Sequence, residues 1–390
     1  MRVLALVSAD FGELSYAKYF LSGLATAPAP APTLLVPASL GQPEGPEGGA
    51  IQRNYADLAG ILAAVEETRP QIVLFFSAYL LTIGPRFSMF NTLWLVHVLR
   101  RRGIPMLTSD PFIGLLHTPW ALQFDAVLPS HAGFYASLHA RLAHWRMSLR
   151  GYLTHLRLRQ VWHIYPAPMA HLAVQGPRRQ CAFYNPPAVP TQAEGPSGGL
   201  PAPLWLFVLS AIDLQYQLKL HGQSFFVQVA ARLQDAVHSG TNVLVLAPPE
   251  MLQRLRSLLP AGAPVELRDR CQHADYLRLL QQAQHLFLWN YYSFSVLHRV
   301  LNQQAVFFFA EGHMVSILPA LQDEGIRAFY GGWRPPLLPI AEPLAPEALE
   351  QLGRQTCHHF ANMKAHMAQG ISAQAVLDLA SGTGERTQHK

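Results

Sequence analysis

The chain has 390 residues, which is more than one ordinary hydrophobic core serves, and this length predicts two domains. Half of its residues are apolar, yet no apolar run reaches the roughly 18 unbroken residues that a membrane span needs. The net charge of +5 is modest, and its densest sources are "VLRRRG" (98–103) and the arginines between 141 and 159. These basic residues fit a solvated face, or contact with an anionic ligand or a membrane surface, and no nucleic-acid-binding module accompanies them.

The start of the chain and its cysteines indicate a cytoplasmic protein. "MRVLALVSAD" has neither a long apolar core nor a small-residue cleavage site, so it predicts a first strand and not a signal peptide. Cys181, Cys271 and Cys357 are far apart, which favours a reducing compartment over a disulfide framework. In "CHHF" (357–360), Cys357 and His358 would face different sides of a helix, so we expect no metal site.

The first half of the chain alternates strand-like and helix-like segments, which predicts a parallel sheet with helices on both faces. Strands are expected at residues 2–8, 33–38, 71–77, 104–110, 124–130 and 160–166. Helices are expected at residues 14–25, 55–69 and 92–102. Pro70 and Gly103 follow two of these helices and are typical helix stop signals. This half is predicted to be one domain, 1–185.

A Pro/Gly-rich stretch at 186–203 cannot form a core and predicts a linker, after which the alternation resumes in a second domain, 204–345. Its strands are expected at residues 204–210, 242–248, 263–269, 285–290, 305–310 and 326–332. Its helices are expected at residues 224–239, 249–260, 273–284, 295–303 and 316–325. A long closing helix at 346–370 and a partly disordered tail at 371–390 complete the prediction.

The segment 273–313, "HADYLRLLQQAQHLFLWNYYSFSVLHRVLNQQAVFFFAEGH", runs through helix, strand, polar turn, helix and strand. In this order it resembles the donor domain of GT-B glycosyltransferases, and the resemblance covers about 203–333 well and 1–130 loosely. Two features depart from the family: no Glu lies between Trp289 and Gln304, where the family often holds the ribose, and no GxGxxG motif occurs. The resemblance implies an α/β protein with two Rossmann-like doubly wound domains facing across a cleft.

The implied activity is transfer of a sugar from a nucleotide sugar to a glycan, lipid-linked, peptide or natural-product acceptor. The nucleotide sugar would be the donor substrate, with no separate cofactor and no metal, and peripheral membrane contact is left open. Two alternatives are a catalytically silent binding or assembly partner of the same fold and a sugar-nucleotide epimerase. No GxSxG motif supports a hydrolase.

The candidate donor site lies around "NYYSFSVLHR" (290–299) and at neighbouring strand ends. Ser293 and Ser295 can cap a helix that begins near Val296, and its free amides would then hold a diphosphate. Arg299 could neutralise a phosphate, or be an ordinary charge on the helix surface. Glu311 is a substitute for the missing ribose carboxylate. The other donor-side candidates are Ser210, Asp213, Lys219, Pro248, Glu250, Tyr291, Phe294 and His313.

The candidate acceptor site lies in loops that follow strands of the first domain. Transfer with inversion needs a base that deprotonates the acceptor, and Asp10 and Glu13 follow the first predicted strand. The alternative for Glu13 is an ordinary acid at a helix N-terminus. Asp110 and His131 follow two further predicted strands and are placed on the acceptor side.

Overall fold

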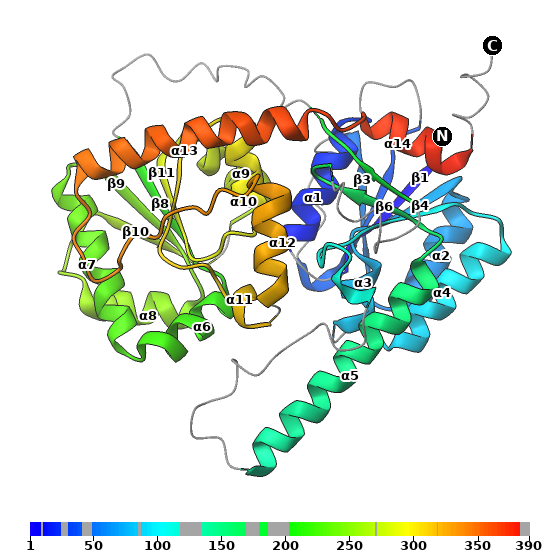
Figure 1. Ribbon diagram of the computed structural model, residues 1–390, viewed down its shortest axis with the longest axis horizontal. Coiled ribbons are helices and arrows are strands. Elements are labelled where there is room, and N and C mark those ends of the chain that lie inside the picture. Colours follow the sequence, from blue (N-terminus) through cyan, green and yellow to red (C-terminus); the bar gives the residue numbers. More distant parts are fainter. Residues whose placement is uncertain are drawn as a thin grey trace. The chain divides into compact units, whose positions relative to one another are not determined.

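The computed structural model describes residues 1–8, 11–24, 30–40, 49–84, 87–117, 134–168, 179–185, 203–269, 271–317 and 319–382. These residues form two compact units (Figure 1). Unit 1 contains the described residues up to Asn185 together with those from Ala365 onward, and unit 2 contains those from 203 to Lys364. The predicted linker at 186–202 lies outside the described residues.

Unit 1 is built on a seven-stranded sheet with the order β3-β2-β1-β4-β5-β6-β7, in which every pair of neighbours is parallel. The strand order reverses between β1 and β4, as in doubly wound sheets. The strands are β1 Val3–Leu6, β2 Thr33–Pro37, β3 Ile51–Tyr55, β4 Ile72–Phe75, β5 Met106–Ser109, β6 Trp162–Tyr165 and β7 Gln180–Ala182.

The helices of unit 1 include one that comes from the far end of the chain. Ala373, Val376 and Leu377 of α14 are buried in the same core cluster as the residues of α1 and β1. The region predicted as a tail therefore contains a helix that completes the core of unit 1. The described helices of the unit are α1 Phe11–Ser22, α2 Leu58–Thr68, α3 Ala78–Ile83, α4 Met89–Arg101, α5 Phe134–Leu158 and α14 Ala373–Ser381, with short 3-10 turns η1 Ala38–Leu40 and η3 Leu115–His117.

The inner strands of this sheet agree with prediction, whereas its two edge strands, β3 and β7, were not predicted. β3 reads "IQRNY" and exposes much of its length, and β7 has only three residues, so neither shows the continuous apolar run of a central strand. The long helix α5 was also missed, because its apolar residues are interrupted by arginine and histidine all along it. The strand expected at 124–130 lies outside the described residues.

Unit 2 has a five-stranded parallel sheet with the order β10-β9-β8-β11-β12. The runs "LFLW" and "VFFF" supply its aromatic core: Phe207 stacks on Phe287 with ring centroids 4.4 Å apart, and Phe287 lies 5.3 Å from Phe307 on the neighbouring strand. The strands are β8 Leu204–Val208, β9 Asn242–Leu246, β10 Val265–Arg268, β11 Ala283–Leu288 and β12 Val306–Phe308.

The helices of unit 2 agree with prediction except near residues 211–221 and 326–332. The loop expected after β8 is a helix, α6, and the last strand expected at 326–332 is wrong, because those residues end α12 and form a turn. The described helices are α6 Ala211–His221, α7 Ser224–His238, α8 Pro249–Leu258, α9 His273–Gln282, α10 Phe294–Leu301, α11 Met314–Ile317, α12 Pro319–Phe329 and α13 Pro346–Met367. No helix among the described residues is long and apolar enough to cross a bilayer.

Candidate functional site

The carboxyl edge of the unit 2 sheet brings together three loops that are far apart in sequence. The strand order reverses between β8 and β11, and ligands of open α/β sheets bind outside the strand ends at such a switch point. α6 starts directly after β8 and α10 directly after β11, so the N-termini of both helices lie at this edge. The loop that follows β12 lies at the same edge, because its residues contact α6 and the loop after β11.

Asp213 connects the start of α6 to the loop after β12. Its Oδ1 accepts hydrogen bonds from the backbone amide of His313 (3.2 Å) and from Nδ1 of the same ring (2.8 Å), and its Oδ2 accepts one from Ser210 Oγ (2.7 Å). Ser210 Oγ in turn accepts from the Asp213 amide and caps α6. Since Asp213 is buried and both of its oxygens are bonded, it orients His313 and does not contact a phosphate itself. Nε2 is then the second hydrogen-bonding atom of the His313 ring.

Gly312 brings the loop after β12 against the loop after β11. Its φ of +86° is a left-handed conformation that favours glycine, and a Cβ at this position would lie 2.9 Å from atoms of Asn290. The Oδ1 atom of Asn290 also accepts a hydrogen bond from the amide of Tyr292 (2.9 Å). A side chain at position 312 would therefore separate two of the three loops at the switch point.

The N-terminus of α10 has the cap that the sequence predicted. Ser293 is the N-cap, and its Oγ accepts a hydrogen bond from the Val296 amide (3.3 Å). Ser293 and Phe294 are only half-buried, so the part of the chain that the structure describes does not fully cover the tip of the helix. Amides in the first turn of a helix lack acceptors within the helix and attract anions. Ser295 is not a second cap: it is buried inside the helix and bonds to the Tyr276 hydroxyl.

Solved structures with a similar fold match almost the whole chain. The structure of Os79 from O. sativa in complex with UDP matches 98% of this chain and 99% of its own at 13% identity, with a TM-score of 0.55. A putative UDP-N-acetylglucosamine 2-epimerase from Listeria monocytogenes matches 100% and 98% of the two chains at 11% identity, with a TM-score of 0.55. The glycotransferase of kitacinnamycin matches 98% of both chains at 12% identity, with a TM-score of 0.52.

The chain has the GT-B fold. This confirms the predicted fold class of two Rossmann-like domains, and at such low identity it is the fold alone that is shared. No protein-family model matches the chain, and no curated protein matches its sequence. The shared fold does not specify an activity.

Two further donor-side candidates have partners within the protein. Tyr291 is buried, packs edge-on against Phe308, and donates its hydroxyl hydrogen to the Pro335 carbonyl, so it belongs to the core and does not stack on a base. Glu311 is three-quarters buried and pairs with Arg334 at 2.5 Å. Arg334 was not identified from the sequence, where it stands in a turn with no motif around it. The ribose role of Glu311 stays a prediction.

The remaining donor-side candidates lie at different distances from the switch point. Pro248 is the N-cap of α8 and Glu250 is exposed in the first turn of that helix, so both lie at the carboxyl end of β9 as predicted. Lys219 is exposed in the last turn of α6, about 9 Å further along the helix than Asp213. Lys219 therefore lies away from the N-terminus of α6, and its role as a donor-side residue stays a prediction.

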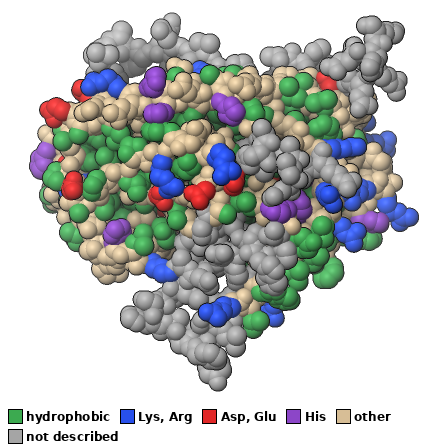
Figure 2. Space-filling view, in the orientation of Figure 1, with side chains coloured by type: hydrophobic (Ala, Val, Ile, Leu, Met, Phe, Trp, Pro, Cys, Tyr) green, Lys and Arg blue, Asp and Glu red, His purple; other side chains and the backbone are tan. Residues whose placement is uncertain are grey.

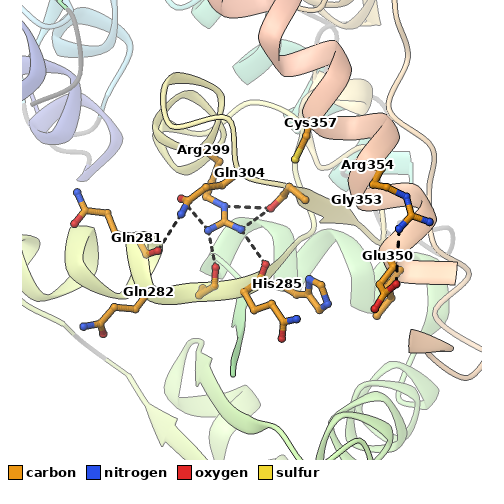
Figure 3. A pocket seen from close by; sticks show the side chains of 13 residues that line it. Gln281, Gln282, His285, Arg299, Gln304, Glu350, Gly353, Arg354 and Cys357 are labelled. Carbon is orange, nitrogen blue, oxygen red and sulfur yellow. Dashed lines mark hydrogen bonds and ion pairs between the residues drawn. The ribbon is translucent and has the colours of Figure 1, made fainter. Parts of the chain in front are cut away.

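Arg299 is not a phosphate ligand, and it is not a surface charge either. The side chain is 1% exposed, and its guanidinium donates hydrogen bonds to five acceptor atoms. Burial lowers its pKa to about 10, so it stays charged at neutral pH. The group lines a cavity of about 450 Å³ at the amino ends of β11 and β12, on the opposite edge of the sheet from the switch point (Figure 3). The acceptors are the carbonyls of Leu280, Ala283, Gln284 and Ala305 and Oε1 of Gln304.

In unit 1, two of the four acceptor-side candidates have structural roles. Glu13 is buried, and its Oε2 accepts hydrogen bonds from the amide and the hydroxyl of Ser8, which stabilises the turn between β1 and α1. Asp110 is buried at the end of β5, and its oxygens accept from the amides of Phe112 (2.9 Å) and Gly114 (2.6 Å). Burial raises the pKa of Asp110, which these hydrogen bonds oppose. The role of Glu13 as a base and the acceptor-side role of Asp110 stay predictions.

The other two acceptor-side candidates, Asp10 and His131, lie outside the described residues. His117, at the end of η3, was not identified from the sequence, because no pattern distinguishes it among 18 histidines. Its Nδ1 lies 2.9 Å from the carbonyl oxygen of Gly114, so Nδ1 is the donor and Nε2 of the neutral ring is an acceptor. That tautomer is the one a general base requires.

A buried chain of polar groups lies behind this loop. His163 Nδ1 donates to the Val161 carbonyl (2.9 Å), so its Nε2 accepts from the Tyr79 hydroxyl (2.8 Å), and the Tyr79 oxygen accepts from His155 Nδ1 (3.3 Å). Burial lowers the pKa of His163 to about 3 and that of His155 to about 4. Both rings are neutral at physiological pH, and this hydrogen-bonded network stabilises the fold of unit 1.

Proposed function

We propose that this protein is a glycosyltransferase that binds a nucleotide sugar at the carboxyl edge of the unit 2 sheet and transfers the sugar to an acceptor. The observation that carries the proposal is the switch point itself, where the Ser293-capped tip of α10 lies beside the Asp213–His313 pair. Helix-tip amides and an oriented imidazole suit a diphosphate, which must be stabilised as it leaves. Because this machinery resembles that of GT-B glycosyltransferases, the proposal includes no separate cofactor.

The acceptor would be activated by a base from unit 1. Asp10 remains the predicted base, and His117 is a second candidate because of its tautomer. Substitution of the base by asparagine should abolish turnover while nucleotide binding persists, so comparing Asp10→Asn with His117→Asn identifies which of the two residues is the base. The reduced cysteines fit a cytoplasmic location, which is part of the same proposal.

A thermal-shift panel with UDP, GDP, TDP and CMP tests the binding step. Two matched N-cap variants distinguish loss of the proposed site from the general effect of losing a helix cap. Ser293 caps α10 at the proposed site, and Ser372 caps α14 in unit 1 by the same kind of hydrogen bond (3.2 Å). Replacing either serine by alanine should cost about 1 kcal/mol of stability. Only Ser293→Ala should also reduce the nucleotide-induced shift. A shift with none of the nucleotides would contradict the proposal.

A sugar-nucleotide epimerase is the second candidate, because one of the similar solved structures is a putative enzyme of that class. The two activities differ in their need for an acceptor. Conversion of a nucleotide sugar to its epimer without any acceptor would favour the epimerase, whereas release of free nucleotide only when an acceptor is present would favour the transferase.

A further inference from the structure

The charge of this chain is divided very unevenly along its length. Residues 68–193 contain twelve arginines, no lysine and only two acidic residues, Asp110 and Asp125, which gives them a net charge of +10. The rest of the chain therefore has a net charge of −5. Of the two acids, Asp110 is buried and hydrogen-bonded, so it does not offset the arginines at the surface.

Many of these arginines lie on two helices of unit 1 that contain no acidic residue, α4 and α5. The two helices are connected where they end, because Nη2 of Arg100 donates to the carbonyl of Arg157 (2.5 Å). Lys and Arg side chains gather over the end of unit 1 that carries α4 (Figure 2). Arg101, Arg141, Arg146 and Arg150 are among the arginines of this region that are exposed and form no ion pair with another described residue.

The same helices expose large apolar side chains. On α4, Phe90 is 76% exposed and Trp94 is 56% exposed, and their spacing of four residues places them on one face. On α5, Leu142 and Trp145 are also exposed. Exposed apolar groups of this size in a cluster mark a surface that contacts something else.

The N-terminal half of α5 extends away from the sheet of unit 1 (Figure 1). The described residues between 141 and 146 are all exposed although they point to different sides of the helix, whereas Ser148 and Gly151 are buried. Gly151 lies where the helix meets Leu116 and Ile83. Among the described residues, the C-terminal half of α5 packs against the rest of the unit, whereas the side chains described between 141 and 146 do not.

We propose that α4 and the N-terminal half of α5 bind the surface of an anionic lipid bilayer. The arginines would pair with lipid phosphates, and Phe90, Trp94, Leu142 and Trp145 would enter the interface, which is the usual composition of interfacial helices. A second copy of the chain is disfavoured as the partner, because two such surfaces would repel each other. The inference is independent of the proposed transferase activity.

Vesicle flotation of the full chain tests the proposal. We expect binding to phosphatidylcholine vesicles that contain about 30% phosphatidylglycerol, and little binding to phosphatidylcholine alone. Raising the ionic strength to about 0.5 M should weaken the binding, because the arginines would then be screened. Equal binding to neutral and anionic vesicles, or binding to neither, would overturn the proposal.

Three variants, each checked for an unchanged melting temperature, locate the surface. Replacing Arg141, Arg146 and Arg150 together by glutamine should lower vesicle binding about 100-fold, from about five-fold per arginine. Phe90→Ser with Trp94→Ser should lower it at least about ten-fold. The matched control, Leu220→Ser with Arg256→Gln, changes an exposed apolar residue and an exposed arginine of unit 2 and should change nothing.

The same variants distinguish lipid from other polyanions. A single-stranded RNA homopolymer is the probe for the alternative, because exposed arginine and tryptophan also suit nucleic acid. Vesicle binding that the α4 and α5 variants reduce and RNA does not displace supports the proposal. Tight RNA binding through the same residues, without vesicle binding, refutes it.

Discussion

Arg299→Lys separates a structural arginine from a phosphate ligand. The guanidinium of Arg299 donates six hydrogen bonds within unit 2, and a lysine has three donors, so at least three of these bonds are lost. At about 1.5 kcal/mol for each bond from a charged group, the variant should lose about 4–5 kcal/mol of unfolding free energy. For a unit of this size the melting temperature should fall by about 10–15 °C.

The assay combines urea unfolding with nucleotide titration at a temperature where the variant is folded. Arg278→Lys is the matched control, because Arg278 is exposed and pairs only with Asp275 on its own helix, so its loss should cost under about 0.5 kcal/mol. Nucleotide affinity should be unchanged in both variants. The reasoning would be refuted by an Arg299→Lys protein of normal stability that binds nucleotide poorly.

Three other perturbations have defined outcomes. The pKa of His163 is about 3 in the folded protein and 6.5 in the unfolded chain, so unfolding takes up a proton below pH 6.5. His163 should lower stability by about 2 kcal/mol between pH 7 and pH 5 in urea unfolding, and His155, with a folded pKa of about 4, should add to this loss; a flat profile would contradict neutral buried rings. Gly312→Ala should abolish the nucleotide-induced thermal shift, since its Cβ would collide with Asn290; a normal shift would show that the loops need not touch. Asp213→Asn should weaken nucleotide binding about ten-fold in calorimetry by releasing His313, and an unchanged affinity would remove the pair from the site.

The fold could be predicted where strands are buried on both faces. Ile72–Phe75 and Leu204–Val208 are continuous apolar runs, and such runs are typical of central parallel strands. Edge strands such as Ile51–Tyr55 are half-exposed and lack this signal. At 326–332 the sequence "IRAFYGG" is apolar enough for a strand, but Ile326 and Ala328 are buried residues of α12.

The location of the candidate site could be predicted more reliably than the side chains that form it. Strand ends and the Ser293 cap follow from local pattern, because a cap depends on residues a few positions apart. The surroundings of Arg299 depend on carbonyls from α9, β11 and the turn before β12, which come together only in the folded chain. The Asp213–His313 pair joins residues 100 positions apart, so no local pattern could reveal it.

Unit 1 takes residues from both sides of unit 2 in sequence, and this has a consequence for synthesis on the ribosome. The described residues of unit 2 all lie between 203 and Lys364, so it can fold as soon as that stretch has left the exit tunnel. Unit 1 must wait for Ala373, Val376 and Leu377, whose side chains fill its core. A nascent chain that stops before Ala365 would therefore contain a folded unit 2 and an incompletely folded unit 1. The apolar surface that α14 normally covers would then be exposed to chaperones and proteases.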